Sequence, residues 1–234
     1  MNNKKAIVWA FIPARGGSKG IKLKNIKNLN GKPLLQWSID SLKRSNIFSK
    51  IIVSSDSSRI LNLAKKNDVE IDIRKKPEDS DDFSMPDLPL LTFLKSCQKQ
   101  ELPNFIFMVQ CTSPFIRPQT FKKAFNLLIT KPNDTIFSAR KSSYFLWLDR
   151  NKANKNVIPI GHPFKKRLGR QFLKDQQYIE SGSFYGFSVN NFMRYKHRFF
   201  NEAFPCEIND FEFIDINTLD DFKYAQFISK KFIL

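Results

Sequence analysis

The sequence predicts an α/β fold, with a Rossmann-like, mainly parallel sheet that carries helices on both faces. Short apolar runs alternate with segments of helical periodicity along the first two thirds of the chain. The chain has 234 residues, of which 41% are hydrophobic, and can therefore bury one sizeable core. Polar or charged residues follow the apolar runs, at Arg15, Asp56, Arg74 and Gln110. We expect one domain over residues 1–234, with ligands beyond the carboxyl ends of the strands.

The first elements follow from local patterns. The apolar run Ala6 to Ile12 predicts a strand, and the apolar spacing after Pro33 predicts a helix over residues 33–44. Residues 51–53 predict a short buried strand, and the hydroxyls and carboxylate of residues 54–58 can cap a helix over residues 59–66. The same alternation predicts strands over residues 70–73, 105–109 and 135–139 and helices over residues 88–100 and 118–130.

The alternation stops between Lys141 and Ile179. This stretch is polar, basic and aromatic, with Tyr144, Phe145 and Trp147 near its start, so we expect an excursion from the sheet. A surface insertion without a partner is the alternative, although it would leave three aromatic side chains exposed. The chain then returns to the sheet, with strands expected over residues 183–189 and 211–216 and a closing helix over residues 219–230.

A glycine-rich, cationic loop follows the first strand. Gly16, Gly17 and Gly20 allow the backbone to approach an anion closely, while Arg15 and Lys19 supply positive charge. The spacing fits neither GxxxxGK[ST] nor GxGxxG, so an ordinary strand-to-helix turn is the alternative interpretation. The lysines and the asparagine that follow extend the polar surface, which favours a triphosphate as the ligand.

Residues 12–34, 109–117, 170–185 and 215–218 form four ordered blocks of motifs. These blocks resemble the acylneuraminate cytidylyltransferases, the enzymes that activate sialic acids and related nonulosonic acids as CMP-sugars. The family patterns are IPARGGSKGI followed by KN and GKPL, LQPTSPLR, RRQ with ENGSFY, and DIDT. They are similar here to residues 12–34, 109–117, 170–185 and 215–218, respectively. The resemblance implies the nucleotide-diphospho-sugar transferase type of this fold, and it implies that residues 141–179 form a dimerisation element that lends residues to the partner's site.

The resemblance also implies the chemistry and the nucleotide site. The anomeric hydroxyl of the sugar attacks the α-phosphorus of CTP and pyrophosphate leaves, which requires positioning and charge neutralisation more than a protein nucleophile. The implied catalytic residues are Arg15, Lys19 and Asp215. The implied CTP-binding residues are Ala14, Arg15, Gly16, Ser18, Lys19, Lys24, Asn25, Arg74 and Asp82. For Arg74, a solvated charge at a strand end is the alternative.

The remaining site residues concern the sugar and a metal ion. The implied sugar-binding residues are Gln110, Ser113, Arg170, Gln171 and Tyr185, although Arg170 could also be part of a solvated basic run. Asp215 and Asn217 are the candidate ligands for Mg²⁺, with Mn²⁺ as an alternative. If they lie on a strand, residues two apart point the same way.

Three positions depart from the family patterns. Asn217 stands where a second aspartate is usual, Cys111 where the first proline of LQPTSPLR is usual, and Ser181 where asparagine is usual. The first departure puts the affinity for the metal in doubt, and the last puts the identity of the sugar in doubt. A legionaminic- or pseudaminic-type sugar and a non-catalytic nucleotide-binding protein are therefore alternatives, and activation of Kdo fits the opening motif less well.

Composition restricts the partners. The formal charge is +17, from 39 lysines and arginines against 22 acidic residues, but the basic residues are spread along the chain, so we expect no nucleic-acid partner. The apolar runs are too short for a membrane span or a signal peptide, so we expect no membrane partner and a cytoplasmic location. Three well-separated cysteines indicate neither a disulfide framework nor a zinc site. The expected partners are CTP, a nonulosonic acid and a second copy of the chain.

Overall fold

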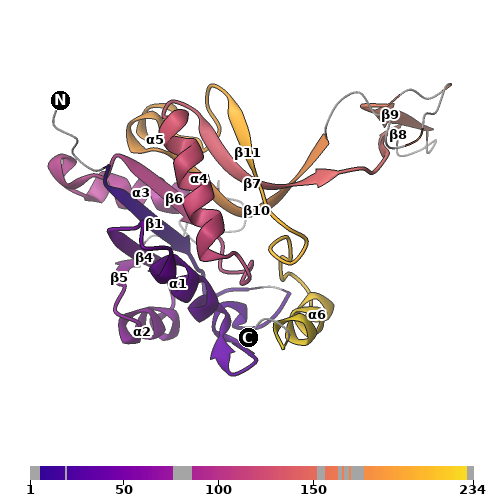
Figure 1. The fold of residues 1–234 in the computed structure, drawn as a ribbon. Helices are drawn as coiled ribbons and strands as arrows, with labels where there is room; N and C mark the ends of the chain where they lie inside the picture. The colour runs from indigo at the N-terminus through magenta and orange to yellow at the C-terminus, as the bar shows by residue number, and fades with distance from the viewer. Residues whose placement is uncertain are drawn as a thin grey trace.

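A seven-stranded sheet forms the centre of the computed structural model, which describes residues 6–18, 20–75, 86–151, 156–162, 165, 169 and 177–230. The strands lie in the order β11, β7, β10, β6, β1, β4, β5. Their bounds in the same order are Ala203–Glu207, Thr135–Ser142, Gln177–Ser188, Phe105–Val109, Val8–Pro13, Lys50–Ser55 and Glu70–Ile73. The predicted α/β fold is confirmed (Figure 1).

The strands β5, β4, β1 and β6 are parallel, whereas β10 is antiparallel to both β6 and β7. The chain starts in the middle of the sheet at β1, builds outward through β4 to β5, and then returns to add β6 on the other side of β1. The point between β1 and β6, where the direction of building reverses, is where ligands of such sheets bind.

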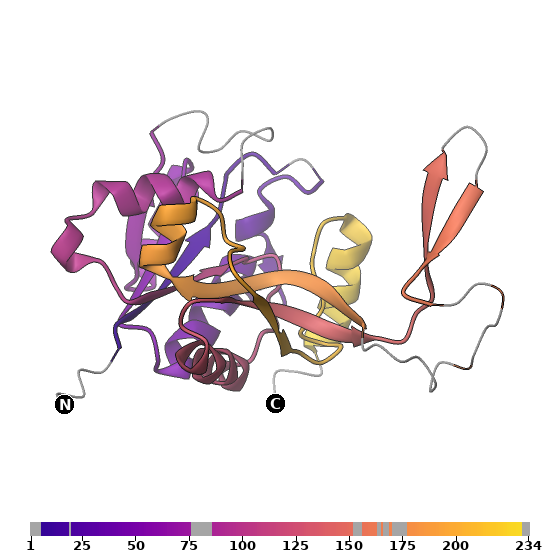
Figure 2. The same ribbon diagram turned by 90° about the horizontal axis from the view of Figure 1, so that it is seen from above.

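Helices cover both faces of the sheet (Figure 2). The helices α1 (Leu34–Ser45), α2 (Ser58–Lys66) and α4 (Pro118–Thr130) bury their apolar sides on one face, with Ile39, Ile60 and Phe121 among the buried residues. The helices α3 (Leu88–Ser96) and α5 (Val189–Tyr195) cover the other face. Neighbours such as Ala10 and Phe11 are buried on opposite faces of the sheet, which explains why the central strands β1 and β6 are apolar throughout.

A third apolar cluster joins the closing helix to the start of the chain. The helix α6 (Leu219–Ser229) packs Phe222 and Ile228 against Ile21 and Trp37. It begins with a capping box, because the Thr218 side chain accepts from the backbone of the third helical residue, whose carboxylate accepts from the backbone N–H of Thr218. The connection between β1 and α1 contains three short elements. They are the 3₁₀ helix η1 (Lys24–Ile26) and the paired strands β2 (Asn28–Leu29) and β3 (Lys32–Pro33).

The strand predicted over residues 211–216 is wrong, because residues 210–213 form a turn and the edge strand is β11 instead. The side chain of Asn209 accepts from the backbone N–H groups of Phe211 and Glu212, each at 3.0 Å, which makes the turn. Glu212, only 2% exposed, accepts at 2.8 Å from the backbone N–H of Arg117 at the start of α4. The buried Glu212 carboxylate thus provides a hydrogen-bond acceptor for a backbone N–H at the start of α4, and this contact holds residues 211–216 outside the sheet.

Two further boundaries differ from the prediction by four residues or more. The helix α3 ends at Ser96 rather than at residue 100, and the 3₁₀ helix η3 (Lys99–Glu101) follows it. The strand β10 begins at Gln177, earlier than predicted, because its first part pairs with the extended end of β7. A shift in register between Glu180 and Tyr185 separates this part from the rest of the strand.

The strands β7 and β10 continue beyond the body as a two-stranded arm, and a hairpin of β8 (Leu146–Asn151) and β9 (Asn156–Ile160) lies at its far end (Figures 1 and 2). The predicted excursion is thus present. Several large apolar side chains on it are exposed, namely Tyr144, Leu146, Trp147, Leu148, Val157 and Ile160.

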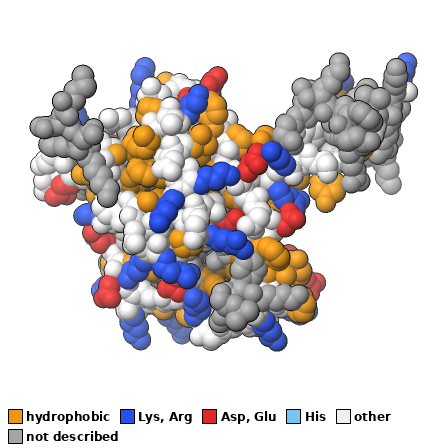
Figure 3. Space-filling view, in the orientation of Figure 1, with side chains coloured by type: hydrophobic (Ala, Val, Ile, Leu, Met, Phe, Trp, Pro, Cys, Tyr) orange, Lys and Arg blue, Asp and Glu red, His pale blue; other side chains and the backbone are white. Residues whose placement is uncertain are grey.

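Lysine and arginine side chains are spread over the face of the body seen in Figure 3, between acidic and apolar side chains. Among the described residues, no helix combines the length and the apolar character that crossing a membrane would require.

Candidate active site

The glycine-rich loop leaves β1 at the reversal point of the sheet and is fastened to the loop after β4. The backbone N–H of Gly16 donates to Asp56 Oδ1 at 2.7 Å. A Cβ at position 16 would lie 2.9 Å from the Cβ of Ser57, so the close approach requires glycine. The structure therefore places Ala14, Arg15, Gly16 and Ser18 at the carboxyl end of β1, as predicted. Lys19 lies outside the described residues.

A buried asparagine connects this loop to the loop after β6. Asn25 is 5% exposed, and its Nδ2 donates to the carbonyl oxygen of Arg15 at 3.0 Å. Its Oδ1 accepts from the thiol of Cys111, with a Sγ–Oδ1 distance of 3.3 Å. Because a carbonyl can only accept, the two partners are consistent with one orientation of the amide. Burial raises the pKa of the Cys111 thiol to about 12, so the thiol stays protonated and acts as a donor.

Lys24 reaches from η1 to the segment before α6. Its Nζ donates to the carbonyl oxygen of Ile216 at 2.6 Å and to Asn217 Oδ1 at 3.1 Å. Burial lowers the pKa of Lys24, and the negative charge of Asp215 partly offsets that effect. The ammonium group of Lys24 is thus held in place by one backbone carbonyl oxygen and one side-chain amide oxygen.

Asp215 and Asn217 lie together even though their segment is not a strand. Asn217 Nδ2 donates to Asp215 Oδ2 at 2.6 Å. The other carboxylate oxygen of Asp215, Oδ1, is buried and has no hydrogen-bond partner among the described residues. A buried carboxylate oxygen without a donor suits a hard divalent cation. The described residues hold no cluster of three or more acidic, histidine or cysteine side chains, so phosphate and water would have to complete the shell.

The glycine-rich loop, the loop after β6 and the segment before α6 meet beside Asp215 and Asn217. The backbone N–H of Ile216 donates to the carbonyl oxygen of Thr112 at 2.9 Å, which fastens the segment to the loop after β6. A Cβ on Gly20 would lie 2.3 Å from the carbonyl oxygen of Asn217, so the glycine-rich loop touches the same segment. We call the resulting group the nucleotide-side junction; its members are Arg15, Lys24, Asn25, Cys111, Asp215 and Asn217.

Arg74 lies at the carboxyl end of β5, two strands away from β1. Its Nε donates to Ser54 Oγ at 2.9 Å, and its backbone N–H donates to the carbonyl oxygen of Ser55 at 3.0 Å. Ser54 Oγ in turn donates to Asp72 Oδ2 at 2.6 Å. This network holds the base of the Arg74 side chain against β4. Asp82 lies outside the described residues.

The loop that follows β6 contains Gln110 and Ser113. The backbone N–H of Gln110 donates to the carbonyl oxygen of Ser183 at 2.8 Å, which ties this loop to the irregular part of β10. Ser113 is buried, and its Oγ has no hydrogen-bond partner among the described residues, so it can still bond to a ligand. Arg170 and Gln171 lie outside the described residues.

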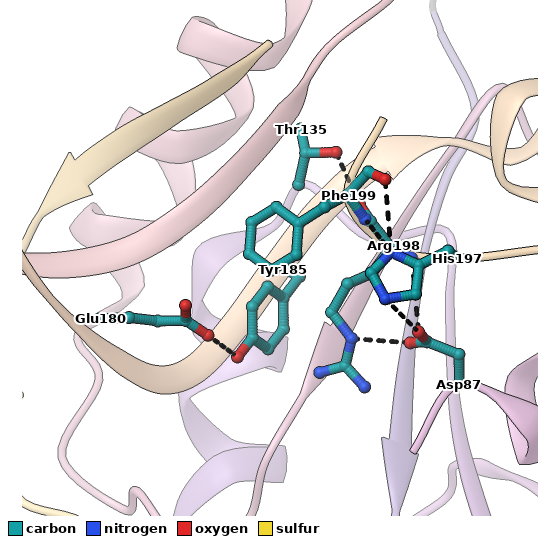
Figure 4. A network of polar contacts seen from close by, with 7 residues as sticks. All are labelled: Asp87, Thr135, Glu180, Tyr185, His197, Arg198 and Phe199. Atoms are coloured by element: carbon teal, nitrogen blue, oxygen red, sulfur yellow. Dashed lines mark hydrogen bonds and ion pairs between the residues drawn. The ribbon is translucent and has the colours of Figure 1, made fainter. Parts of the chain in front are cut away.

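Tyr185 belongs to a second polar network, which the sequence did not reveal (Figure 4). Tyr185 is 5% exposed, and its hydroxyl donates to Glu180 Oε1. The guanidinium of Arg198 lies 4.5 Å from the centre of the ring, and Arg198 Nε donates to Asp87 Oδ1 at 2.6 Å. Burial and the Glu180 carboxylate raise the pKa of Tyr185, so its hydroxyl remains a donor. We call Asp87, Glu180, Tyr185 and Arg198 the tyrosine clamp.

Asp87 and Arg198 carry the buried charges of this clamp, and nothing in the sequence marks either of them as a site residue. Asp87 precedes an apolar helix, where an acidic residue reads as a helix cap, and Arg198 follows Lys196 and His197 in a basic run. Only the fold shows that both side chains are buried.

The sequence of this chain is similar to those of known cytidylyltransferases. A family model described as cytidylyltransferase matches residues 9–201. The chain is 31% identical over 188 residues to N-acylneuraminate cytidylyltransferase A of Danio rerio, covering 78% of this chain and 41% of that protein. It is 25% identical over 225 residues to a pseudaminic acid cytidylyltransferase of Campylobacter jejuni, covering 94% of this chain and 95% of that protein. The chain thus spans about two fifths of the fish protein but almost all of the bacterial one.

A solved structure shows the same fold. The structure of CMP:2-keto-3-deoxy-manno-octonic acid synthetase in complex with CTP aligns with a TM-score of 0.72 at 12% identity, covering 97% of this chain and all of the other. A 4-diphosphocytidyl-2C-methyl-D-erythritol synthase from Anaerococcus prevotii aligns with a TM-score of 0.67 at 16% identity.

Proposed function

The chain belongs to the cytidylyltransferase family, and on that premise we propose that it uses CTP to activate a sialic acid or a related nonulosonic acid, releasing pyrophosphate. The observation that carries the proposal is the nucleotide-side junction. There the glycine-rich loop, Lys24 and the carboxylate of Asp215 converge at the reversal point of the sheet. This arrangement combines backbone N–H groups, cations and one carboxylate, as the transfer of a nucleotidyl group requires.

On the nucleotide side, the basic residues neutralise charge on the leaving group. In this proposal Arg15 and Lys19 bind the β- and γ-phosphates, aided by the backbone of Ala14, Gly16 and Ser18. Lys24 and Asn25 lie nearer to the α-phosphate, where Lys24 can exchange its bond to Asn217 for one to a phosphate oxygen. Arg74 is proposed to contact the cytosine, and Asp82 is proposed as a further CTP-binding residue.

Asp215 is proposed as the main protein ligand of Mg²⁺, or alternatively of Mn²⁺. The free Oδ1 of Asp215 supports this role. The amide oxygen of Asn217 accepts from Lys24 in the structure, so Asn217 becomes available to a metal ion when Lys24 turns to phosphate. When bound, such an ion neutralises phosphate charge and orients the α-phosphorus. This chain's own residues orient Asp215 through Asn217 and hold the loop through Asn25.

On the sugar side, Gln110, Ser113, Arg170, Gln171 and Tyr185 are the proposed contacts. The buried hydroxyl of Ser113 supports the assignment, because it has no other hydrogen-bond partner among the described residues.

A particular observation favours a second candidate for the sugar. The Campylobacter relatives named pseudaminic acid cytidylyltransferases match this chain over 95% of their own length, whereas the matched N-acylneuraminate cytidylyltransferases of Danio rerio and Oncorhynchus mykiss are matched over 41% and 42%. A pseudaminic- or legionaminic-type acid is therefore the alternative substrate.

We also propose that residues 141–179 form a homodimer. The exposed apolar side chains of the hairpin, with Trp147 at 41% exposure and Leu148 at 47%, support this proposal, because two-fold pairing would bury them. Light scattering should give twice the chain mass of 27.4 kDa at micromolar concentration, and a monomer mass would contradict the proposal. The cytoplasmic location and the absence of a nucleic-acid partner stay predictions.

The experiment that tests the function is a coupled pyrophosphate assay with Mg²⁺, CTP and a panel of sialic, legionaminic, pseudaminic and Kdo-type acids. We expect turnover with at least one nonulosonic acid and little with Kdo. Folded protein that binds CTP but turns over no member of the panel would favour a non-catalytic nucleotide-binding protein.

A further inference from the structure

Two oppositely charged side chains are buried beneath Tyr185. The side chain of Asp87 is 4% exposed and that of Arg198 is 10% exposed, and Arg198 Nε lies 2.6 Å from Asp87 Oδ1. The backbone N–H of Arg198 also donates to Asp87 Oδ2, at 3.4 Å. The two residues come from distant parts of the chain, since Asp87 precedes α3 and Arg198 follows α5.

Stability alone does not explain this pair. The loss of hydration of two buried charges offsets most of their mutual attraction, and apolar side chains of similar size often serve a fold equally well. The surrounding cluster is otherwise apolar, with Leu90, Met108 and Phe187 among its buried residues. A buried ion pair in such a place therefore calls for a role beyond packing.

The contacts of Tyr185 indicate that role. Arg198 stacks on its ring at 4.5 Å, Phe199 meets it nearly edge-on with ring centres 5.7 Å apart, and its hydroxyl is bonded to Glu180. Asp87 fixes Arg198, so the position of the ring and of its hydroxyl is determined from three sides (Figure 4). Tyr185 as a whole is almost fully buried, whereas Glu180 is exposed.

The clamp also lies beside the proposed sugar contacts. Tyr185 pairs with Met108, two residues before Gln110, and the irregular stretch between Glu180 and Tyr185 contains Ser183, whose carbonyl oxygen accepts from the backbone N–H of Gln110. A sugar at Gln110 would therefore meet the hydroxyl end of Tyr185 and the carboxylate of Glu180, rather than the buried face of the ring.

We propose that Asp87 and Arg198 are positioning residues for the sugar, which act by holding Tyr185 and thereby the Glu180 carboxylate. The proposal rests on the proposed function. Glu180 would accept a hydrogen bond from a donor on the sugar, either a hydroxyl or an acylamino N–H. Because the clamp is formed before the sugar arrives, little side-chain entropy would be lost on binding.

The main test replaces the ion pair as a unit, with Asp87→Leu and Arg198→Met in one variant. Removing one charge alone would leave its partner buried and unpaired and would strongly destabilise the fold, whereas the double replacement keeps the core apolar. We expect the KM for the sugar to rise about tenfold, as for the loss of one well-placed polar contact, with the KM for CTP changed less than about twofold.

The control for loss of an ion pair elsewhere is the double variant Lys32→Met and Asp40→Leu, whose side chains are 33% and 29% exposed. This pair also has a bond of 2.6 Å and a cation over an aromatic ring, since Lys32 Nζ lies 4.3 Å from the centre of the Trp37 ring. It should leave both KM values unchanged. Tyr185→Phe, which removes only the hydroxyl, keeps the test valid if the first double variant does not fold, and it too should raise only the KM for the sugar.

The outcomes separate the two proposals. Absence of turnover by the wild-type protein with every acid would contradict the proposed function and this inference with it. An active wild-type protein whose sugar KM is unchanged by both the clamp double variant and Tyr185→Phe would overturn the inference alone. Equal effects of the clamp and control variants would also overturn it.

Discussion

The nucleotide-side junction and the tyrosine clamp are built differently. In the junction, the bonds of Lys24 go to a carbonyl and an amide oxygen, and a thiol and an amide connect the loops. In the clamp, Asp87 neutralises Arg198 at 2.6 Å. The polar side chains of the junction connect loops to one another, whereas the clamp uses charge to fix an aromatic side chain. We infer that the junction determines the rate and the clamp determines the affinity for the sugar.

The largest expected effect concerns the only carboxylate of the junction. Asp215→Ala should abolish pyrophosphate release, because phosphate and water alone position a metal ion poorly. It should also weaken the binding of Mn²⁺ in the presence of CTP, measured by electron paramagnetic resonance. The companion Asn217→Asp should lower the Mg²⁺ concentration that gives half the maximal rate. An active Asp215→Ala variant, together with an unchanged Mg²⁺ titration for Asn217→Asp, would place the metal elsewhere.

Next in size is the loss of a phosphate-binding cation. Arg15→Ala should lower kcat by roughly two to four orders of magnitude, because negative charge increases on the departing pyrophosphate. The control is Arg59→Ala, which removes an exposed arginine from the first turn of α2. The two variants should have similar melting temperatures. If Arg15→Ala changed stability and left kcat intact, the loop would be structural only.

A smaller effect should follow from removing the thiol that holds Asn25. Cys111→Ala should lower kcat/KM for CTP about fivefold, the equivalent of one neutral hydrogen bond, and Cys111→Ser should restore much of it. Cys206→Ala is the matched control, since Cys206 is equally buried but lies in β11. Both alanine variants should lose similar stability, so equal kinetic losses would show that the thiol does not position the loop.

The smallest effect is a shift in pH dependence. Burial lowers the pKa of Lys24 from 10.5, so its ammonium group is present below the lowered pKa and is lost as the pH rises through it. In the wild-type protein kcat/KM for CTP should thus fall at alkaline pH before an ordinary lysine titrates. Lys24→Arg should remove this fall, since arginine stays charged. Identical alkaline profiles for the two proteins would assign the fall to another group.

The sequence predicted the parallel half of the sheet well and the other half less well. In the parallel half, β1 and β6 are apolar runs, and the glycine-rich loop follows β1 as the local pattern predicted. The segment 211–216 has the alternation of a strand, yet the buried Glu212 is bonded to the start of α4. That contact joins residues far apart in the chain, which a local pattern cannot show.

The site residues divide in the same way. Those that local motifs carry, such as Arg15, Lys24 and Asp215, lie near one another. The roles of Cys111, Asp87 and Arg198 became visible only in three dimensions, because each depends on a partner from another part of the chain. Cys111 departs from the family pattern, which has a proline at this position, and the structure shows that its thiol donates to Asn25.

The most direct test of the central claim is phosphorus NMR of a reaction that contains the wild-type protein, Mg²⁺, CTP and the best acid of the panel. The account predicts that the α-phosphorus of CTP moves into a single phosphodiester with the sugar, while an equal amount of pyrophosphate appears. Unchanged CTP, or free CMP formed at the same rate with and without the sugar, would contradict it.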